Sequence, residues 1–133
     1  MTFTRNRRLT ALLEDAEPSI AAHWERCRES AIAGATREAT DRIDLRIRAF
    51  FQALKALPAA AEEEKIVKAL ASLFDDLERI DQETGGGLLE EAERDLLEPL
   101  FLNAAEIAGL DPNNFPHREP AGRKLDFTAA RER

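Results

Sequence analysis

The stretch RIDLRIRAFFQALKAL, residues 42–57, decides the fold class because its apolar residues recur at the spacing of an amphipathic helix. They follow one another in alternating steps of four and three residues, at Ile43, Ile47, Phe50, Leu54 and Leu57. Residues 59–83 repeat this spacing, at Ile66, Leu70, Leu73, Leu77 and Ile80. Two such seams predict an all-α protein whose helices pack at a shallow angle, as in an antiparallel bundle.

The rest of the chain fits a bundle of about four to six helices in a single domain, residues 1–133. We expect a first helix over about residues 4–17, ended by Pro18, and a second helix capped by Ser19. A helix over residues 88–108 is expected to kink at Pro99 and to stop at Gly109. The proline-rich stretch DPNNFPHREPAGRK, residues 111–124, predicts a loop, and a short terminal helix is expected to begin near Asp126.

The net charge of −7 is unevenly distributed along the chain. Residues 75–98 hold ten acidic residues against Arg79 and Arg94, for a net charge of −8. Such a field repels nucleic acid and anionic membranes and attracts basic partners, whereas the alternative reading is a solvated helix face that maintains solubility. The predicted partner-binding residues are Glu78, Asp81, Glu90, Glu91, Glu93 and Asp95.

Arginines in the N-terminal half offer a weaker case for nucleic-acid binding. They are Arg5, Arg7, Arg8, Arg42, Arg46 and Arg48. Interleaved aromatic residues are missing and the global charge opposes such binding, so we expect these side chains to form internal ion pairs.

Three consecutive glycines, residues 85–87, precede the acidic helix and resemble a phosphate-binding loop at first sight. A phosphate loop needs free backbone N–H groups at a helix N-terminus and usually a lysine or arginine nearby. Here Glu90 and Glu91 open the helix, and no strand precedes the glycines. We therefore interpret the glycines as a flexible connection between two helices.

Four carboxylates support an enzymatic alternative. Glu14 and Glu17 form an E-x-x-E pair, and Glu38 with Asp41 forms an E-x-x-D pair. Carboxylates three residues apart share a helix face, and two such pairs on facing helices can hold Mg²⁺ for hydrolysis of nucleotide pyrophosphates. The pattern resembles the motif of the all-α nucleotide pyrophosphohydrolases of the MazG type, although Pro18 stands where that family continues its helix.

His23 and Cys27 lie four residues apart and can share a helix face. Two ligands do not make a zinc site, and the other histidine, His117, is distant in the sequence, so we predict a structural cysteine beside a surface histidine and no metal. With one cysteine no disulfide can form within the chain, which suits a reducing compartment. No apolar run is long enough for a signal peptide or a membrane span, so we expect a cytoplasmic protein.

Residues 73–133 resemble small acidic bacterial proteins of the immunity or toxin-neutralising kind. The resemblance lies in the acidic helix start at Glu93-Arg94-Asp95, the stop at Gly109-Leu110-Asp111 and the terminal D-x-T-x-x-R-E pattern at residues 126–132. It implies a small helical protein that binds a basic partner, and it assigns no catalytic residues.

These observations favour a non-enzymatic protein-interaction module without a cofactor, and in particular an acidic inhibitor of a basic partner such as a nuclease. The first alternative is the Mg²⁺-dependent pyrophosphohydrolase just described. The second is a helical dimerisation unit, because the same four-three seams would also serve a homodimer.

Overall fold

The structure, a computed structural model, describes residues 2–30, 35–59 and 62–114. These residues form four α-helices and a short 3-10 helix, and no strand occurs among them. The helices are α1 (Thr2–Glu29), α2 (Arg37–Lys55), α3 (Glu63–Glu83) and α4 (Glu91–Ala108), followed by η1 (Pro112–Asn114). The all-α prediction is confirmed. The predicted terminal helix and most of the predicted proline-rich loop fall outside the described residues.

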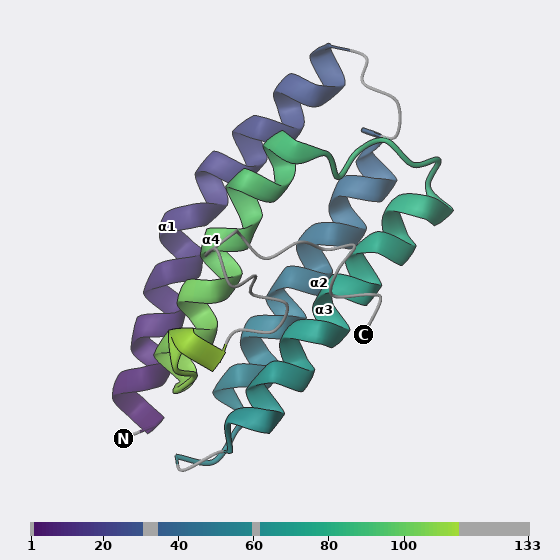
Figure 1. Ribbon diagram of the computed structural model, residues 1–133. Helices are drawn as coiled ribbons and strands as arrows, with labels where there is room; N and C mark the ends of the chain where they lie inside the picture. Colours follow the sequence, from purple (N-terminus) through teal and green to yellow (C-terminus); the bar gives the residue numbers. More distant parts are fainter. Residues whose placement is uncertain (1, 31–34, 60–61, 115–133) are drawn as a thin grey trace.

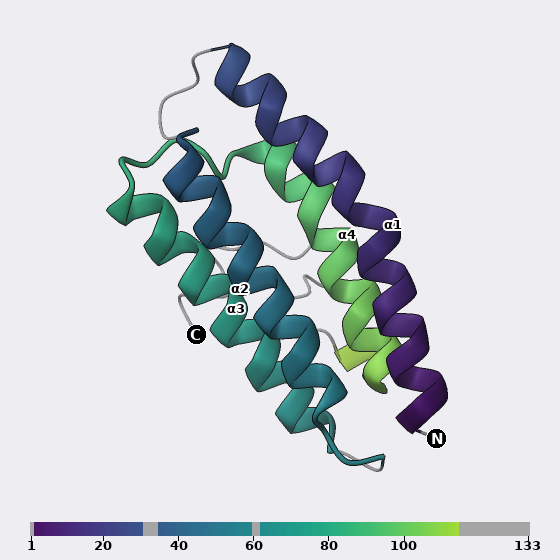
Figure 2. The same cartoon turned by 180° about the vertical axis from the view of Figure 1, so that it is seen from behind.

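The four long helices lie side by side, and helices that follow one another in the chain run in opposite directions (Figure 1). Helix α1 packs along α4, and α2 packs along α3, as the view from behind also shows (Figure 2). Helix α1 also contacts α2, so that all four helices share one core. No described helix is both long and apolar enough to cross a membrane.

The two predicted seams are the inner faces of α2 and α3. Their members from Ile43 to Leu54 and from Ile66 to Ile80 are all buried. Phe101 of α4 joins the two helices, because its ring lies 5.9 Å from the ring of Phe50 and 6.0 Å from that of Phe74. Both seams, from Ile43 to Leu54 and from Ile66 to Ile80, are therefore filled within one chain.

Pro18 does not end the first helix, and this prediction is wrong. Helix α1 runs through it from Thr2 to Glu29, and Ser19 is an internal residue rather than a cap. The proline ring lies on the exposed side and removes one hydrogen bond, whereas the opposite side carries one continuous apolar face from Leu9 through Ile20 to Trp24. Burial of that face outweighs a local cost of about 3 kcal/mol.

Helix α4 begins at Glu91 rather than at the predicted Leu88, and it contains Pro99, as predicted. Its stop at Gly109 is as expected: Gly109 has a φ of 122°, and the N–H of the buried Leu110 donates to the carbonyl of Ala105 at 3.0 Å. The C-terminal end of α4 is thus fixed by backbone bonds and one apolar contact.

The glycine stretch between α3 and α4 is a turn built on left-handed backbone. Gly85, Gly86 and Gly87 have φ values of 112°, 74° and 84°. Asp81 organises the turn: its carbonyl accepts from the N–H of Gly86 at 2.7 Å, and its carboxylate accepts from the N–H of Leu88 at 3.0 Å. Two of the N–H groups that a phosphate would need are thus already satisfied.

Candidate functional site

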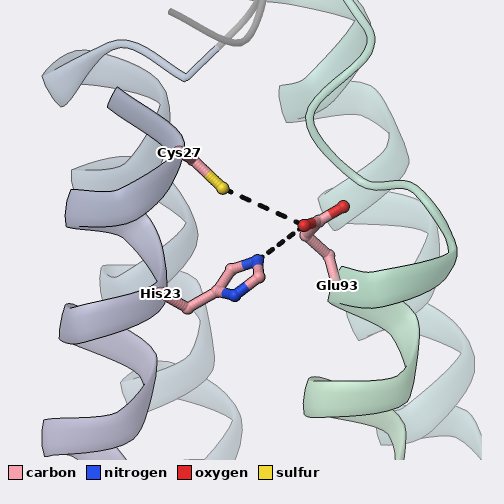
Figure 3. A group of neighbouring side chains, drawn as sticks. All are labelled: His23, Cys27 and Glu93. Atoms are coloured by element: carbon pink, nitrogen blue, oxygen red, sulfur yellow. Dashed lines mark hydrogen bonds and ion pairs between the residues drawn. The ribbon is translucent and has the colours of Figure 1, made fainter. Parts of the chain in front are cut away.

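The interface between α1 and α4 brings together three side chains that carry chemistry: His23, Cys27 and Glu93. His23 and Cys27 lie one turn apart on α1 and point at the first turn of α4, where Glu93 meets them (Figure 3). Glu93 Oε2 lies 2.6 Å from His23 Nε2 and 4.0 Å from Cys27 Sγ. The same carboxylate oxygen therefore contacts both residues of α1.

The site is largely closed to solvent. Cys27 is 3% exposed and Glu93 6% exposed, and the His23 side chain retains 18% exposure. Buried carboxylates are rare without a partner, and the short contact to an imidazole nitrogen supplies one. When Glu93 is ionised it can only accept, so His23 Nε2 is then the donor.

The backbone at the start of α4 holds the second oxygen of the Glu93 carboxylate, Oε1. Glu93 Oε1 accepts from the N–H of Glu90 at 2.9 Å, which is half of a capping box and satisfies a helix-terminal donor. On α1, the ring of Trp24 lies edge-on to the ring of His23 at 5.7 Å, and its Nε1 donates to Asp44 of α2 at 2.9 Å. Both sides of the site are therefore positioned by neighbouring elements.

Burial raises the pKa of the Cys27 thiol, and the nearby Glu93 carboxylate raises it further, while Arg26 and Arg28 partly oppose this. A thiol with a raised pKa is a poor nucleophile at neutral pH. Burial likewise raises the pKa of Asp44, with the hydrogen bond from Trp24 and the charge of Arg48 opposing it.

Among the described residues, only this cluster gathers three or more potential metal-ligating side chains, with one donor atom of each within 4.8 Å of the others. Sequence reasoning found His23 and Cys27 and missed Glu93, which it had placed on the acidic surface. The signal was available in part, since Glu93 falls on the buried stripe that Leu97 and Phe101 continue along α4.

The predicted partner-binding residues divide into two groups. Glu90, Glu91 and Asp95 are exposed at the start of α4. The remainder, Glu78, Asp81 and Glu93, are half-buried or buried, with Asp81 holding the glycine turn and Glu93 the cluster. The structure therefore brings three of the six to an accessible surface.

The arginines of α2 do form internal ion pairs, as expected. Arg46 Nε lies 2.6 Å from Asp76, and Arg42 lies 2.6 Å from Glu83, so α2 neutralises part of the acidic face of α3. Arg48 pairs with Glu17 of α1 at 3.1 Å. Arg5 is also occupied: its buried guanidinium donates to backbone carbonyls at the end of α2 and just beyond it, at Lys55, Leu57 and Pro58.

The four carboxylates of the enzymatic alternative do not meet. Glu14 and Glu17 line a groove of about 400 Å³ between α1 and α2, together with Asp44 and Arg48, and Glu38 and Asp41 do not line it. No three of the four have carboxylate oxygens within 4.8 Å of one another in the described chain. The arrangement does not supply the convergent oxygen ligands that Mg²⁺ requires.

In the part of the chain that the structure describes, the fold and the site together define an all-α protein with a buried His–Cys–Glu cluster between α1 and α4. Comparisons with protein-family models, with curated proteins and with solved structures find no match to this chain. Function therefore has to be argued from these side chains.

Proposed function

We propose that the protein is a non-enzymatic interaction module of the immunity or inhibitor kind that binds a partner with a basic surface. The binding surface consists of the exposed carboxylates at the start of α4: Glu90, Glu91 and Asp95. The observation that carries the proposal is the contrast between two acidic residues of α3 and the two acidic residues at the start of α4. Ion pairs with α2 arginines engage Asp76 and Glu83 of α3, whereas Glu90 and Glu91 are exposed and take part in no ion pair recorded among the described residues.

The positions of these three carboxylates also favour binding of a basic partner. Glu90 precedes the first turn of α4 and Glu91 begins it, and the buried Leu88 and Leu89 separate both from the glycine turn. Asp95 follows Glu91 by four residues and therefore lies on the same side of the helix. Carboxylates grouped in this way can meet lysines and arginines of a cationic cleft and increase the rate of encounter with it.

We further propose that the four helices act as one antiparallel bundle, a single domain that works in the cytoplasm. The support is a core to which all four helices contribute and in which the aromatic rings of α2, α3 and α4 touch. A rigid scaffold of this kind would hold the carboxylates of α4 in a fixed arrangement, which reduces the entropy lost on binding.

The test uses two matched charge reversals in the full chain. The variant Glu90→Lys/Glu91→Lys changes the proposed surface. The control Glu62→Lys/Glu64→Lys changes the residue before α3 and an exposed residue in its first turn, so it alters the net charge by the same amount at the start of another helix. Each variant is used as bait in extracts of the native host, and binding of any captured protein is then measured by calorimetry at two salt concentrations.

We expect the wild type and the control to retain a basic partner, and the α4 variant to lose at least about tenfold in affinity, equivalent to about 1.4 kcal/mol. Binding should also weaken as salt increases. Recovery of no partner, or equal binding by the two variants, would count against the proposed surface.

A further inference from the structure

We propose that His23, Cys27 and Glu93 form a binding site for a single borderline-soft divalent cation of the Zn²⁺ type, with water as the fourth ligand. This inference is independent of the proposed partner surface, because it concerns the buried side of α4 rather than its exposed side. It rests on three donor atoms of different chemistry that two helices direct at one point (Figure 3).

The separations of the donor atoms fit such an ion after small side-chain movements. Tetrahedral zinc with bonds of about 2.1 Å to nitrogen and oxygen and about 2.3 Å to sulfur separates N from O by about 3.4 Å and S from O by about 3.6 Å. The corresponding distances here are 2.6 Å for His23 Nε2 to Glu93 Oε2 and 4.0 Å for Cys27 Sγ to Glu93 Oε2. Each must change by less than about 1 Å, well within the range of side-chain rotation.

The donor set selects the class of metal. A thiolate and an imidazole exclude Mg²⁺ and Ca²⁺, which take oxygen ligands, and favour Zn²⁺ and its spectroscopic substitute Co²⁺. On binding, the Cys27 thiol releases its proton to the solvent and its sulfur bonds the metal. A thiolate, a carboxylate and a neutral imidazole around a divalent cation have no net charge, so the filled site is compatible with its burial.

The surroundings support the ligands as zinc sites usually require. The N–H of Glu90 holds Glu93 Oε1 at 2.9 Å and leaves Oε2 directed at the two α1 residues. The edge contact from Trp24 restricts the imidazole. The 18% exposure of the His23 side chain marks the side from which the ion and the water ligand can enter.

The experiment is a Co²⁺ titration of the purified full chain after removal of metals with a chelator. Cys27 is the single cysteine, so a thiolate-to-cobalt charge-transfer band in the near ultraviolet can arise in the monomer from this residue alone. We expect that band to appear with tetrahedral visible bands, to saturate at one Co²⁺ per chain, and to disappear when Zn²⁺ is added.

Three variants locate the site. Cys27→Ser should abolish the charge-transfer band, and Glu93→Gln, which keeps the shape of the side chain, should weaken Co²⁺ binding by at least about tenfold. His117→Gln, at the chain's other histidine, is the control and should bind as the wild type does. Circular dichroism establishes that each variant is folded.

The wild-type titration decides the proposal even if a variant does not fold. A folded wild-type chain that gives no charge-transfer band, or a band that saturates at half a metal per chain and so indicates a shared site between two chains, would overturn it. An unchanged affinity in a folded Glu93→Gln would remove Glu93 from the ligand set and overturn the three-ligand site.

Discussion

Substitution of Glu93 tests how the junction between α1 and α4 is held together in the metal-free protein. Besides the longer contact of Cys27 Sγ with Oε2 at 4.0 Å, the carboxylate makes two short contacts: Oε2 with His23 Nε2 at 2.6 Å and Oε1 with the N–H of Glu90 at 2.9 Å. Glu93→Ala removes both short contacts. Glu93→Gln keeps an acceptor for the backbone N–H and replaces the charged partner of His23 by a neutral amide.

The two variants should differ in free energy of unfolding by an amount that these contacts set. Loss of the helix-terminal acceptor costs about 1 kcal/mol, and loss of a hydrogen bond with a charged partner costs about 1.5 to 3 kcal/mol. Glu93→Ala removes a buried carboxylate that was costly to desolvate, which offsets part of the sum, so we expect a net loss of about 2 to 3 kcal/mol. Glu93→Gln loses only the difference between a charged and a neutral hydrogen bond, about 1 kcal/mol.

Urea denaturation of the metal-free chain measures both values. Far-ultraviolet circular dichroism follows the helices, and fluorescence follows Trp24, the single tryptophan, whose ring lies 5.7 Å from that of His23. Coincident transitions by the two probes justify a two-state analysis. A loss below about 0.5 kcal/mol in Glu93→Ala, within the range of ordinary surface substitutions, would show that the two contacts do not stabilise the junction. Equal losses in the two variants would contradict the separation of roles.

Two further predictions concern α1 and its contact with α2. Pro18→Ala should restore the missing helical hydrogen bond and stabilise the chain by about 2 to 3 kcal/mol in urea denaturation, since Pro18 is exposed within a continuous helix. Pro99→Ala in α4 is the matched comparison. Unchanged or reduced stability in both variants would refute the reasoning. Asp44→Asn should stabilise the chain at pH 7 while keeping an acceptor for Trp24 Nε1, because burial raises the pKa of Asp44 above its usual 3.8 and ionisation therefore costs the folded state. The stability that protonated Asp44 contributes is fully present below pH 3.8 and is lost as pH rises through the folded pKa. The stability gained by Asp44→Asn should therefore vanish below pH 3.8. An equal gain at pH 7 and below pH 3.8 would contradict burial of the ionised carboxylate as its cause.

The helices of the hairpin α2–α3 are the part of the fold that the sequence predicts best. Their apolar residues recur in alternating steps of four and three residues along each whole helix, and neither helix contains a proline. Periodicity is a property of one segment, so it is readable without tertiary information. The error at Pro18 arose because a local rule about proline was applied where the apolar face continues across it, from Leu13 and Ala16 to Ile20.

Helix α4 shows a second limit of sequence reasoning. In the sequence, Leu89, Ala92, Leu96 and Leu100 recur at helical spacing and fit one apolar stripe, but Ala92 is exposed and Leu97 is buried. Apolar residues are spread around α4, so the sequence is compatible with several buried faces, and packing against α1, α2 and α3 selects one of them. The selected face carries Glu93, and the candidate site depends on that choice.

The cluster itself could not be predicted from spacing, because His23 and Glu93 are 70 residues apart in the chain. The pairing of α1 with α4 brings them together, and no local pattern indicates that pairing. The pair His23–Cys27 was visible at helical spacing, and a carboxylate on the apolar stripe of another helix was the complementary signal. Combining the two requires the topology of the fold.

The first turn of α4 serves both proposals, yet the two can be tested separately. Glu90 contributes its backbone N–H to Glu93, whereas its side chain is exposed. Glu90→Lys/Glu91→Lys therefore changes the proposed partner surface and leaves every ligand atom and the N–H that orients Glu93 in place. Glu93→Gln changes a ligand and leaves the exposed carboxylates unchanged. Partner affinity should respond to the first variant and Co²⁺ affinity to the second, and a loss of both affinities in either folded variant would mean that the metal site and the partner surface are coupled through this turn.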